Sequence, residues 1–79
     1  MVERRRQRRV ECLEIVPIRR DGKPLGSTIL FNYSGVGACF QIPLSFELGN
    51  RFDSTIPQLG VVQCRVVWRS ESRVGVTFK

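Results

Sequence analysis

Hydrophobic and polar residues alternate along this chain with a period of two, and helical spacing is hard to find. The clearest run is VVQCRVVWR, residues 61–69. Val62, Cys64, Val66 and Trp68 lie on one face of this run. Its polar side chains take the other face: Gln63, Arg65 and Arg69. Because successive side chains of a strand point to opposite faces, this run predicts a half-buried strand with Trp68 inside.

Turn signals divide the rest of the chain into five more runs of this kind. The predicted strands cover residues 10–18, 27–33, 37–42, 51–56 and 74–79. Asp21-Gly22 predicts a hairpin, since both residues tolerate positive φ. A loop is expected at residues 43–50. Bends are expected at Gly26, Gly37 and Gly75. Six short strands with one apolar face each can close into a barrel without exposed edges, so we expect an all-β, six-stranded antiparallel barrel.

Charge adds a second feature to this picture. The 79 residues carry a net charge of +6, and five of the thirteen basic residues fall between Arg4 and Arg9. A chain this short is one domain, which we divide into a basic arm, 1–9, and a barrel, 10–79. Like charges repel, so the arm is expected to be flexible. The excess of positive charge predicts an anionic partner.

Several chemistries are excluded or disfavoured by residue type. The chain has no histidine and only seven scattered carboxylates, so we expect no enzymatic activity. Its three cysteines lack C-x-x-C spacing and predict buried thiols in a reducing cytoplasm rather than disulfides or a metal site: Cys12, Cys39 and Cys64. There is no apolar run long enough for membrane insertion.

A polar motif stands where the second predicted strand meets the third. Asn32, Ser34 and Gly37 form an N-x-S-x-x-G pattern. Asn32 and Ser34 are two residues apart in an extended segment, so they point to the same side. Together they offer an amide and a hydroxyl to one planar edge, and the absent side chain of Gly37 lets a flat group approach. Taken alone, such a cluster is more often simply a turn.

The polar motif and the arginine run together resemble the PilZ domain. That family carries an R-x-x-x-R pair followed, across one hairpin, by [D/N]-x-S-x-x-G, and Arg5 and Arg9 fit the arginine positions. The closing GVTF, residues 75–78, is similar to the family's last strand. Arg4 and Arg8 form a second R-x-x-x-R one residue earlier. With Arg5 and Arg9 as the pair, Arg4 precedes the motif, which in the family goes with an intercalated pair of ligands.

The resemblance implies a bacterial, cytoplasmic receptor for the second messenger cyclic di-GMP. The implied ligand-binding residues are Arg5, Arg9, Asn32, Ser34 and Gly37, with Arg4 and Arg8 as secondary candidates. No cofactor is expected, and the barrel is expected to regulate an unidentified effector protein by changing conformation on ligand binding. Arginine suits this ligand because its fork binds phosphate bidentately and its flat face stacks on purines. Asn32 stands where many members have Asp, which affects the expected affinity.

The alternative is a small basic barrel that binds RNA or single-stranded DNA. Such proteins need exposed aromatic side chains for base stacking. Four of the seven aromatic residues here are predicted to face inward: Phe31, Phe40, Trp68 and Phe78. Tyr33 is predicted to pack away from Asn32 and Ser34. Arg65, Arg69 and Arg73 are predicted to point outward as ordinary charges, with contact to the ligand as the alternative. This scarcity of exposed rings counts against nucleic acid. The regulated process, the number of bound ligands and the oligomeric state are left open by the sequence.

Overall fold

The computed structural model describes residues 9–41 and 49–78, and it folds them into six β-strands. The strands are β1 (Val10–Arg20), β2 (Lys23–Tyr33), β3 (Gly37–Gln41), β4 (Arg51–Ile56), β5 (Gly60–Arg69) and β6 (Arg73–Phe78). The all-β prediction is confirmed. Within these ranges no helix is long and apolar enough to cross a membrane. The predicted arginines Arg4, Arg5 and Arg8, and most of the predicted loop at 43–50, lie outside the described residues.

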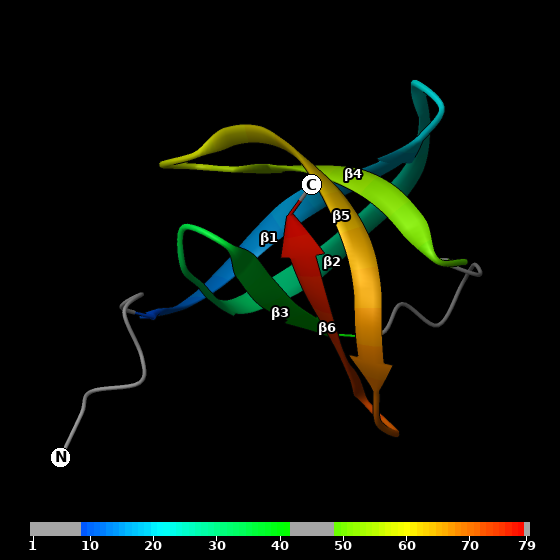
Figure 1. Ribbon diagram of the computed structural model, residues 1–79. Coiled ribbons are helices and arrows are strands. Elements are labelled where there is room, and N and C mark those ends of the chain that lie inside the picture. Colours follow the sequence, from blue (N-terminus) through cyan, green and yellow to red (C-terminus); the bar gives the residue numbers. More distant parts are fainter. Residues whose placement is uncertain (1–8, 42–48, 79) are drawn as a thin grey trace, which may run out of the picture.

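The strands close into a barrel in the order β1-β2-β3-β6-β5-β4, and every neighbouring pair is antiparallel. Figure 1 shows β6 lying between β3 and β5, so the end of the chain is inserted beside its middle. Closure between β1 and β4 is short, because the described pairing joins only Ile18 to Ser54 and Arg19 to Asp53. The predicted six-stranded antiparallel barrel is therefore confirmed.

The β1–β2 hairpin follows the predicted turn. Asp21 and Gly22 have φ values of 54° and 79°, and Arg20 pairs directly with Lys23. Two consecutive residues with positive φ match the twist of the flanking strands, so the ladder continues to the turn itself. This makes both strands longer than their apolar runs. Gly26, with a φ of 140°, lies beside a shift in the β1–β2 register, as expected of a bend.

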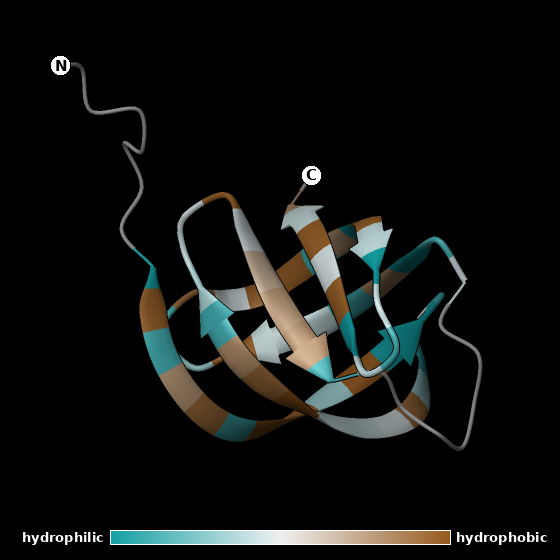
Figure 2. Cartoon of the chain, turned by 90° about the horizontal axis from the view of Figure 1, so that it is seen from below, coloured by the Kyte–Doolittle hydropathy of each residue, from teal (hydrophilic) through white to brown (hydrophobic). Residues whose placement is uncertain are grey.

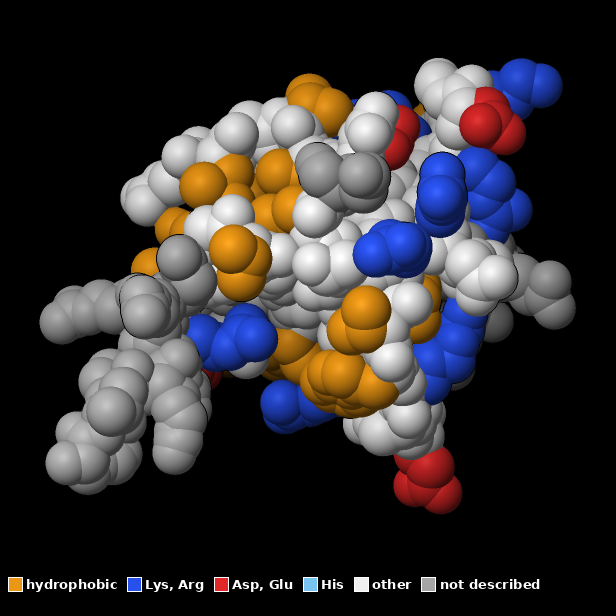
Figure 3. All heavy atoms as spheres, viewed as in Figure 1, with side chains coloured by type: hydrophobic (Ala, Val, Ile, Leu, Met, Phe, Trp, Pro, Cys, Tyr) orange, Lys and Arg blue, Asp and Glu red, His pale blue; other side chains and the backbone are white. Residues whose placement is uncertain are grey.

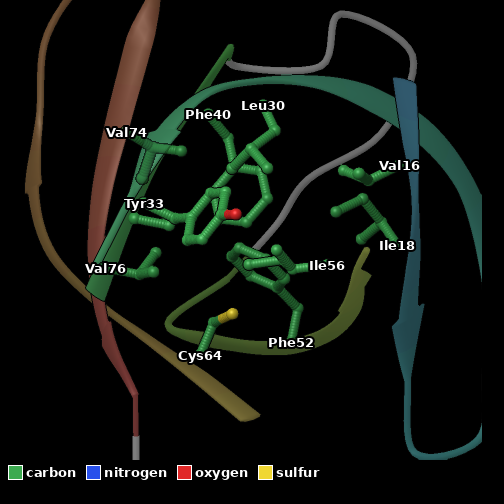
Figure 4. Packing of buried hydrophobic residues seen from close by; sticks show 11 residues of the cluster. Val16, Ile18, Leu30, Tyr33, Phe40, Phe52, Ile56, Cys64, Val74 and Val76 are labelled. Carbon is green, nitrogen blue, oxygen red and sulfur yellow. The ribbon is translucent and has the colours of Figure 1, made fainter. Parts of the chain in front are cut away.

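The barrel interior is filled by one face of each strand. Figure 2 shows hydrophobic and hydrophilic residues alternating along the ribbons, and Figure 4 shows the inward side chains packed together. Phe40 and Phe52 meet edge to face with ring centroids 5.5 Å apart. The apolar side chains without any exposed surface come from five strands: Ile18, Leu30, Phe40, Ile56 and Val74. Tyr33 is buried among them and donates a hydrogen bond to Gln58, which confirms its predicted packing role.

Two β-bulges change which residues face outward. The β2–β3 register shifts between Leu30 and Asn32, and the β5–β6 register shifts between Val66 and Trp68. An extra residue in a strand reverses the alternation beyond it. Trp68 is consequently 48% exposed, so its predicted core position is wrong. Phe31, also predicted inward, is half-buried beneath an arginine and is absent from the core cluster. Figure 3 shows hydrophobic side chains exposed on one face of the barrel.

Candidate ligand-binding site

The β2–β3 bulge and the β5–β6 bulge lie on the same outer surface of the barrel, and a shallow hollow lies between them. Asn32 of β2 pairs with Cys39 of β3, Cys39 with Gly75 of β6, and Gly75 with Trp68 of β5. These four residues form one row over four adjacent strands, a span of about 14 Å at ordinary strand spacing. Cys39 and Gly75 in the middle are small, whereas Asn32 and Trp68 at the ends are larger. A hollow of about 310 Å³ lies over the row.

Trp68 provides one side of the hollow and lies against Gly75. A Cβ added to Gly75 would overlap Nε1 and Cε2 of the indole. The ring therefore rests on the bare backbone of β6 while about half of it stays exposed. An indole held in this way presents a preformed flat surface for stacking.

Arg9 and Asn32 form the opposite side. The guanidinium Nη1 of Arg9 donates a hydrogen bond of 2.7 Å to the side-chain oxygen Oδ1 of Asn32. The β1–β2 ladder explains this contact, because Val10 pairs with Tyr33 and Glu11 with Asn32. The hairpin thus brings together two residues 23 apart in sequence, one from each motif. The Asn32 side-chain NH₂ group and the other guanidinium N–H groups are available to a ligand.

Ser34 and Gly37 have different surroundings from Asn32. Ser34 is 4% exposed, and its hydroxyl accepts a hydrogen bond from the backbone N–H of Val36. The backbone N–H of Ser34 donates a hydrogen bond to the carbonyl of Gly37. Gly37 is buried against β6, where an added Cβ would overlap the carbonyl oxygen of Val76. Neither residue is among those that line the hollow. In the structure both residues organise the β2–β3 turn and the approach of β3 to β6.

Arg73, for which the sequence predicts an outward charge with ligand contact as the alternative, lines the hollow. Its guanidinium carbon lies 4.1 Å from the centre of the Phe31 ring. A cation above an aromatic face is held there electrostatically, so the charge is positioned without a carboxylate. Arg65 and Arg69 point outward as predicted and do not line this hollow.

The outward position of Trp68 has one sign in the sequence. Three apolar residues in succession, Val66, Val67 and Trp68, interrupt the alternation there.

The three cysteines occupy three different environments. Cys64 belongs to the core, and burial first, then the nearby Asp53 carboxylate, raises the pKa of its thiol to about 12. Cys12 is half-buried against the core, and burial followed by Glu14 and Glu11 raises the pKa of its thiol. Cys39 is buried outside the core cluster, on the floor of the hollow. Of the three cysteines predicted to be buried, Cys64 is therefore the one that belongs to the core cluster.

Comparison with known proteins identifies the family. A model of the PilZ domain matches residues 3–79 of the chain. Among solved structures, the chain is similar to the Bacillus subtilis inhibitor of motility, MotI/DgrA, with a TM-score of 0.67 and 15% sequence identity. That likeness in fold covers 99% of this chain and 43% of the neighbour, so the chain spans less than half of its length. No curated protein matches. The chain belongs to the PilZ domain family.

Proposed function

We propose that this chain is a cyclic di-GMP receptor that binds the messenger in the hollow between Asn32 and Trp68. One observation carries the proposal. An arginine of the R-x-x-x-R motif is held by hydrogen bond against the asparagine of N-x-S-x-x-G, opposite an exposed indole that rests on a glycine. Family membership supports the same ligand.

The chemistry of the lining matches the parts of this ligand. The messenger has two phosphates and two guanines, and Arg9 and Arg73 supply guanidinium forks for phosphate oxygens or for the O6 and N7 edge of guanine. Trp68 supplies a face on which a guanine stacks. The amide of Asn32 hydrogen-bonds to a guanine edge. Arg5 completes the arginine pair from the arm, while Ser34 and Gly37 set the shape of the turn beside the base.

The output of the receptor is proposed to be regulation of another protein by a conformational change rather than catalysis. The barrel supplies no histidine, and we assign it neither an enzymatic activity nor a cofactor. The similar solved structure is named as an inhibitor of motility, so control of motility is one candidate process for this chain. Cytoplasmic messenger signalling in a bacterium is the setting that the proposal implies.

Calorimetric titration with four ligands tests the proposal: cyclic di-GMP, cyclic di-AMP, GTP and a short RNA. A guanine-reading site prefers cyclic di-GMP strongly and keeps that preference as salt rises, because hydrogen bonds to base edges carry the discrimination. A general phosphate binder takes all four in order of charge and loses most of its affinity in moderate salt. The exposed indole of Trp68 is also the feature that an RNA-binding barrel would use. Tighter binding of RNA than of cyclic di-GMP would therefore overturn the proposal.

A further inference from the structure

The barrel wall formed by β4 and β5 carries two arginines directly opposite each other. Arg51 of β4 pairs with Arg65 of β5, and both side chains are exposed. Paired residues on neighbouring antiparallel strands have Cα atoms about 5 Å apart. Like charges at that separation lower the stability of the sheet. In the part of the chain that the structure describes, neither guanidinium has a hydrogen bond or an ion pair to offset this repulsion.

The two arginines also line a concavity. A hollow of about 350 Å³ is bordered by Arg51 and Arg65, by Arg20 at the end of β1, and by Asp21 and Asp53. Guanidinium groups from three strands therefore converge on one space, with two carboxylates beside them. In Figure 3 basic side chains gather on the right of the face shown, where the same view in Figure 1 has the β1–β2 turn and the start of β4.

This hollow is separate from the proposed messenger site. In the ring of strands, β4 and β1 stand opposite β3 and β6, which carry the floor of the messenger hollow. Within residues 9–41 and 49–78, the two hollows have no lining residue in common. The one described strand that borders both is β5, which places Arg65 in one hollow and Val67 and Trp68 in the other.

The composition of the lining distinguishes between classes of anion. Among the described residues of the lining, three arginines and two aspartates give a net charge of +1. A nucleic acid or an anionic membrane would bring many negative charges against Asp21 and Asp53. A single carboxylate, in contrast, is matched by two guanidinium forks. Two exposed valines lie on the same strand as Arg65, Val61 four residues before it and Val67 two residues after it, and they add the apolar surface of a protein interface.

We propose that the β4–β5 wall is a docking surface for a partner protein, in which Arg51 and Arg65 together bind one Asp or Glu side chain of that partner. The repulsion between the two arginines is relieved when the carboxylate lies between them. The proposal deepens the adaptor part of the proposed function and rests on it for the existence of a partner. The anion site itself does not involve the messenger.

NMR of the arginine Nε–Hε groups tests the docking surface with defined probes. The protein is titrated with the peptide acetyl-Val-Glu-Val-amide and with its uncharged counterpart, acetyl-Val-Gln-Val-amide. We expect saturable shifts at Arg51 and Arg65 with the Glu peptide and binding at least fivefold weaker with the Gln peptide. Equal binding of the two peptides would overturn the proposal. So would tighter binding of inorganic phosphate or of a short RNA at the same arginines.

Matched variants separate the paired site from general surface charge. Arg65→Ala is expected to weaken Glu-peptide binding at least tenfold, and Arg65→Lys, which keeps the charge but loses the fork, at least threefold. Lys23→Ala removes one charge outside the hollow and is expected to change binding less than twofold. Equal losses in Lys23→Ala and Arg65→Ala would contradict the proposal.

The repulsion between Arg51 and Arg65 is tested separately by thermal unfolding. Removing one of the two arginines is expected to leave the midpoint of thermal unfolding unchanged or to raise it. A lower midpoint would contradict the repulsion on which the proposal rests.

Failure of this proposal and failure of the proposed function give different results. Arg51→Ala and Arg65→Ala are expected to bind cyclic di-GMP within twofold of the parent, because neither residue lines the messenger hollow. Loss of cyclic di-GMP binding in these variants contradicts the separation of the two sites. If the parent protein binds the Glu peptide but does not bind cyclic di-GMP, the docking proposal stands and the proposed messenger function is wrong.

Discussion

The two walls of this barrel are built from the same kind of strand, yet they differ in register. On the wall that borders the proposed messenger hollow, the β2–β3 and β5–β6 pairings each contain a register shift. These shifts place Asn32 and Trp68 at the two ends of one outward row. On the wall proposed for docking, β4 and β5 pair through six successive residues without a shift, which sets Arg51 against Arg65. Irregular pairing thus creates a concave, partly aromatic hollow, whereas regular pairing aligns two like charges.

The difference indicates what each wall can recognise. A hollow with an indole at one end and an arginine–amide pair at the other suits a flat base with phosphates attached. A pair of aligned guanidinium groups suits a single carboxylate. Binding of the messenger is therefore expected to depend on the irregular wall alone.

Arg9→Ala is expected to have the largest effect on binding of cyclic di-GMP, a loss of about 2 kcal/mol or more. The substitution removes charge-assisted hydrogen bonds and leaves Asn32 without its partner. Calorimetry beside Lys23→Ala, which removes an equal charge from the hairpin turn, provides the control. Equal losses in the two variants would mean that overall charge, and not the Arg9–Asn32 pair, controls affinity.

Gly37→Ala is expected to lower the free energy of unfolding by about 2 kcal/mol, because its Cβ overlaps a backbone carbonyl that cannot turn aside. Gly75→Ala is the matched comparison, since its Cβ meets the side chain of Trp68 instead. Gly75→Ala should lose less stability and displace the indole from its platform. Thermal and urea unfolding of the two variants measure the difference, and equal destabilisation would contradict the distinction between the two glycines.

Trp68→Ala is expected to weaken binding of cyclic di-GMP by about 1.5 kcal/mol, within the range for stacking of one base on an aromatic ring. Stability should change little, because the side chain is about half exposed and lies outside the core cluster. Trp68→Phe, which keeps a smaller ring, should recover part of the loss. A large fall in the free energy of unfolding with unchanged affinity would instead show that Trp68 has the structural role that strand alternation predicts.

Ser34→Ala is expected to have the smallest effect, about 1 kcal/mol. The buried hydroxyl accepts a hydrogen bond from Val36 N–H, so the loss should appear in the free energy of unfolding. Affinity for cyclic di-GMP should fall by no more than the same amount, through distortion of the turn. Reduced affinity at unchanged stability would instead show direct reading of the ligand by the hydroxyl.

Alternation and turn chemistry were enough to predict the fold. The six strands, the Asp21-Gly22 hairpin and the closed barrel all follow from short-range patterns. The resemblance placed Arg9 and Asn32 at one site, but their hydrogen bond depends on the register of the β1–β2 ladder, which is shifted twice. The outward position of Trp68 does not follow, because a bulge is an extra residue whose place depends on the partner strand. The same limit applies to Arg51 and Arg65, since their pairing depends on the register between two strands.

The only tryptophan in the chain is Trp68, so intrinsic fluorescence reports on the messenger hollow directly. The central measurement is a fluorescence titration with cyclic di-GMP, with excitation at the red edge to avoid tyrosine, for the parent and for Arg9→Ala. We expect saturable quenching in the parent at the same concentrations at which calorimetry records binding, and much weaker quenching in Arg9→Ala. Calorimetric binding of cyclic di-GMP without any change in Trp68 fluorescence would contradict it, because the messenger would then bind elsewhere on the barrel.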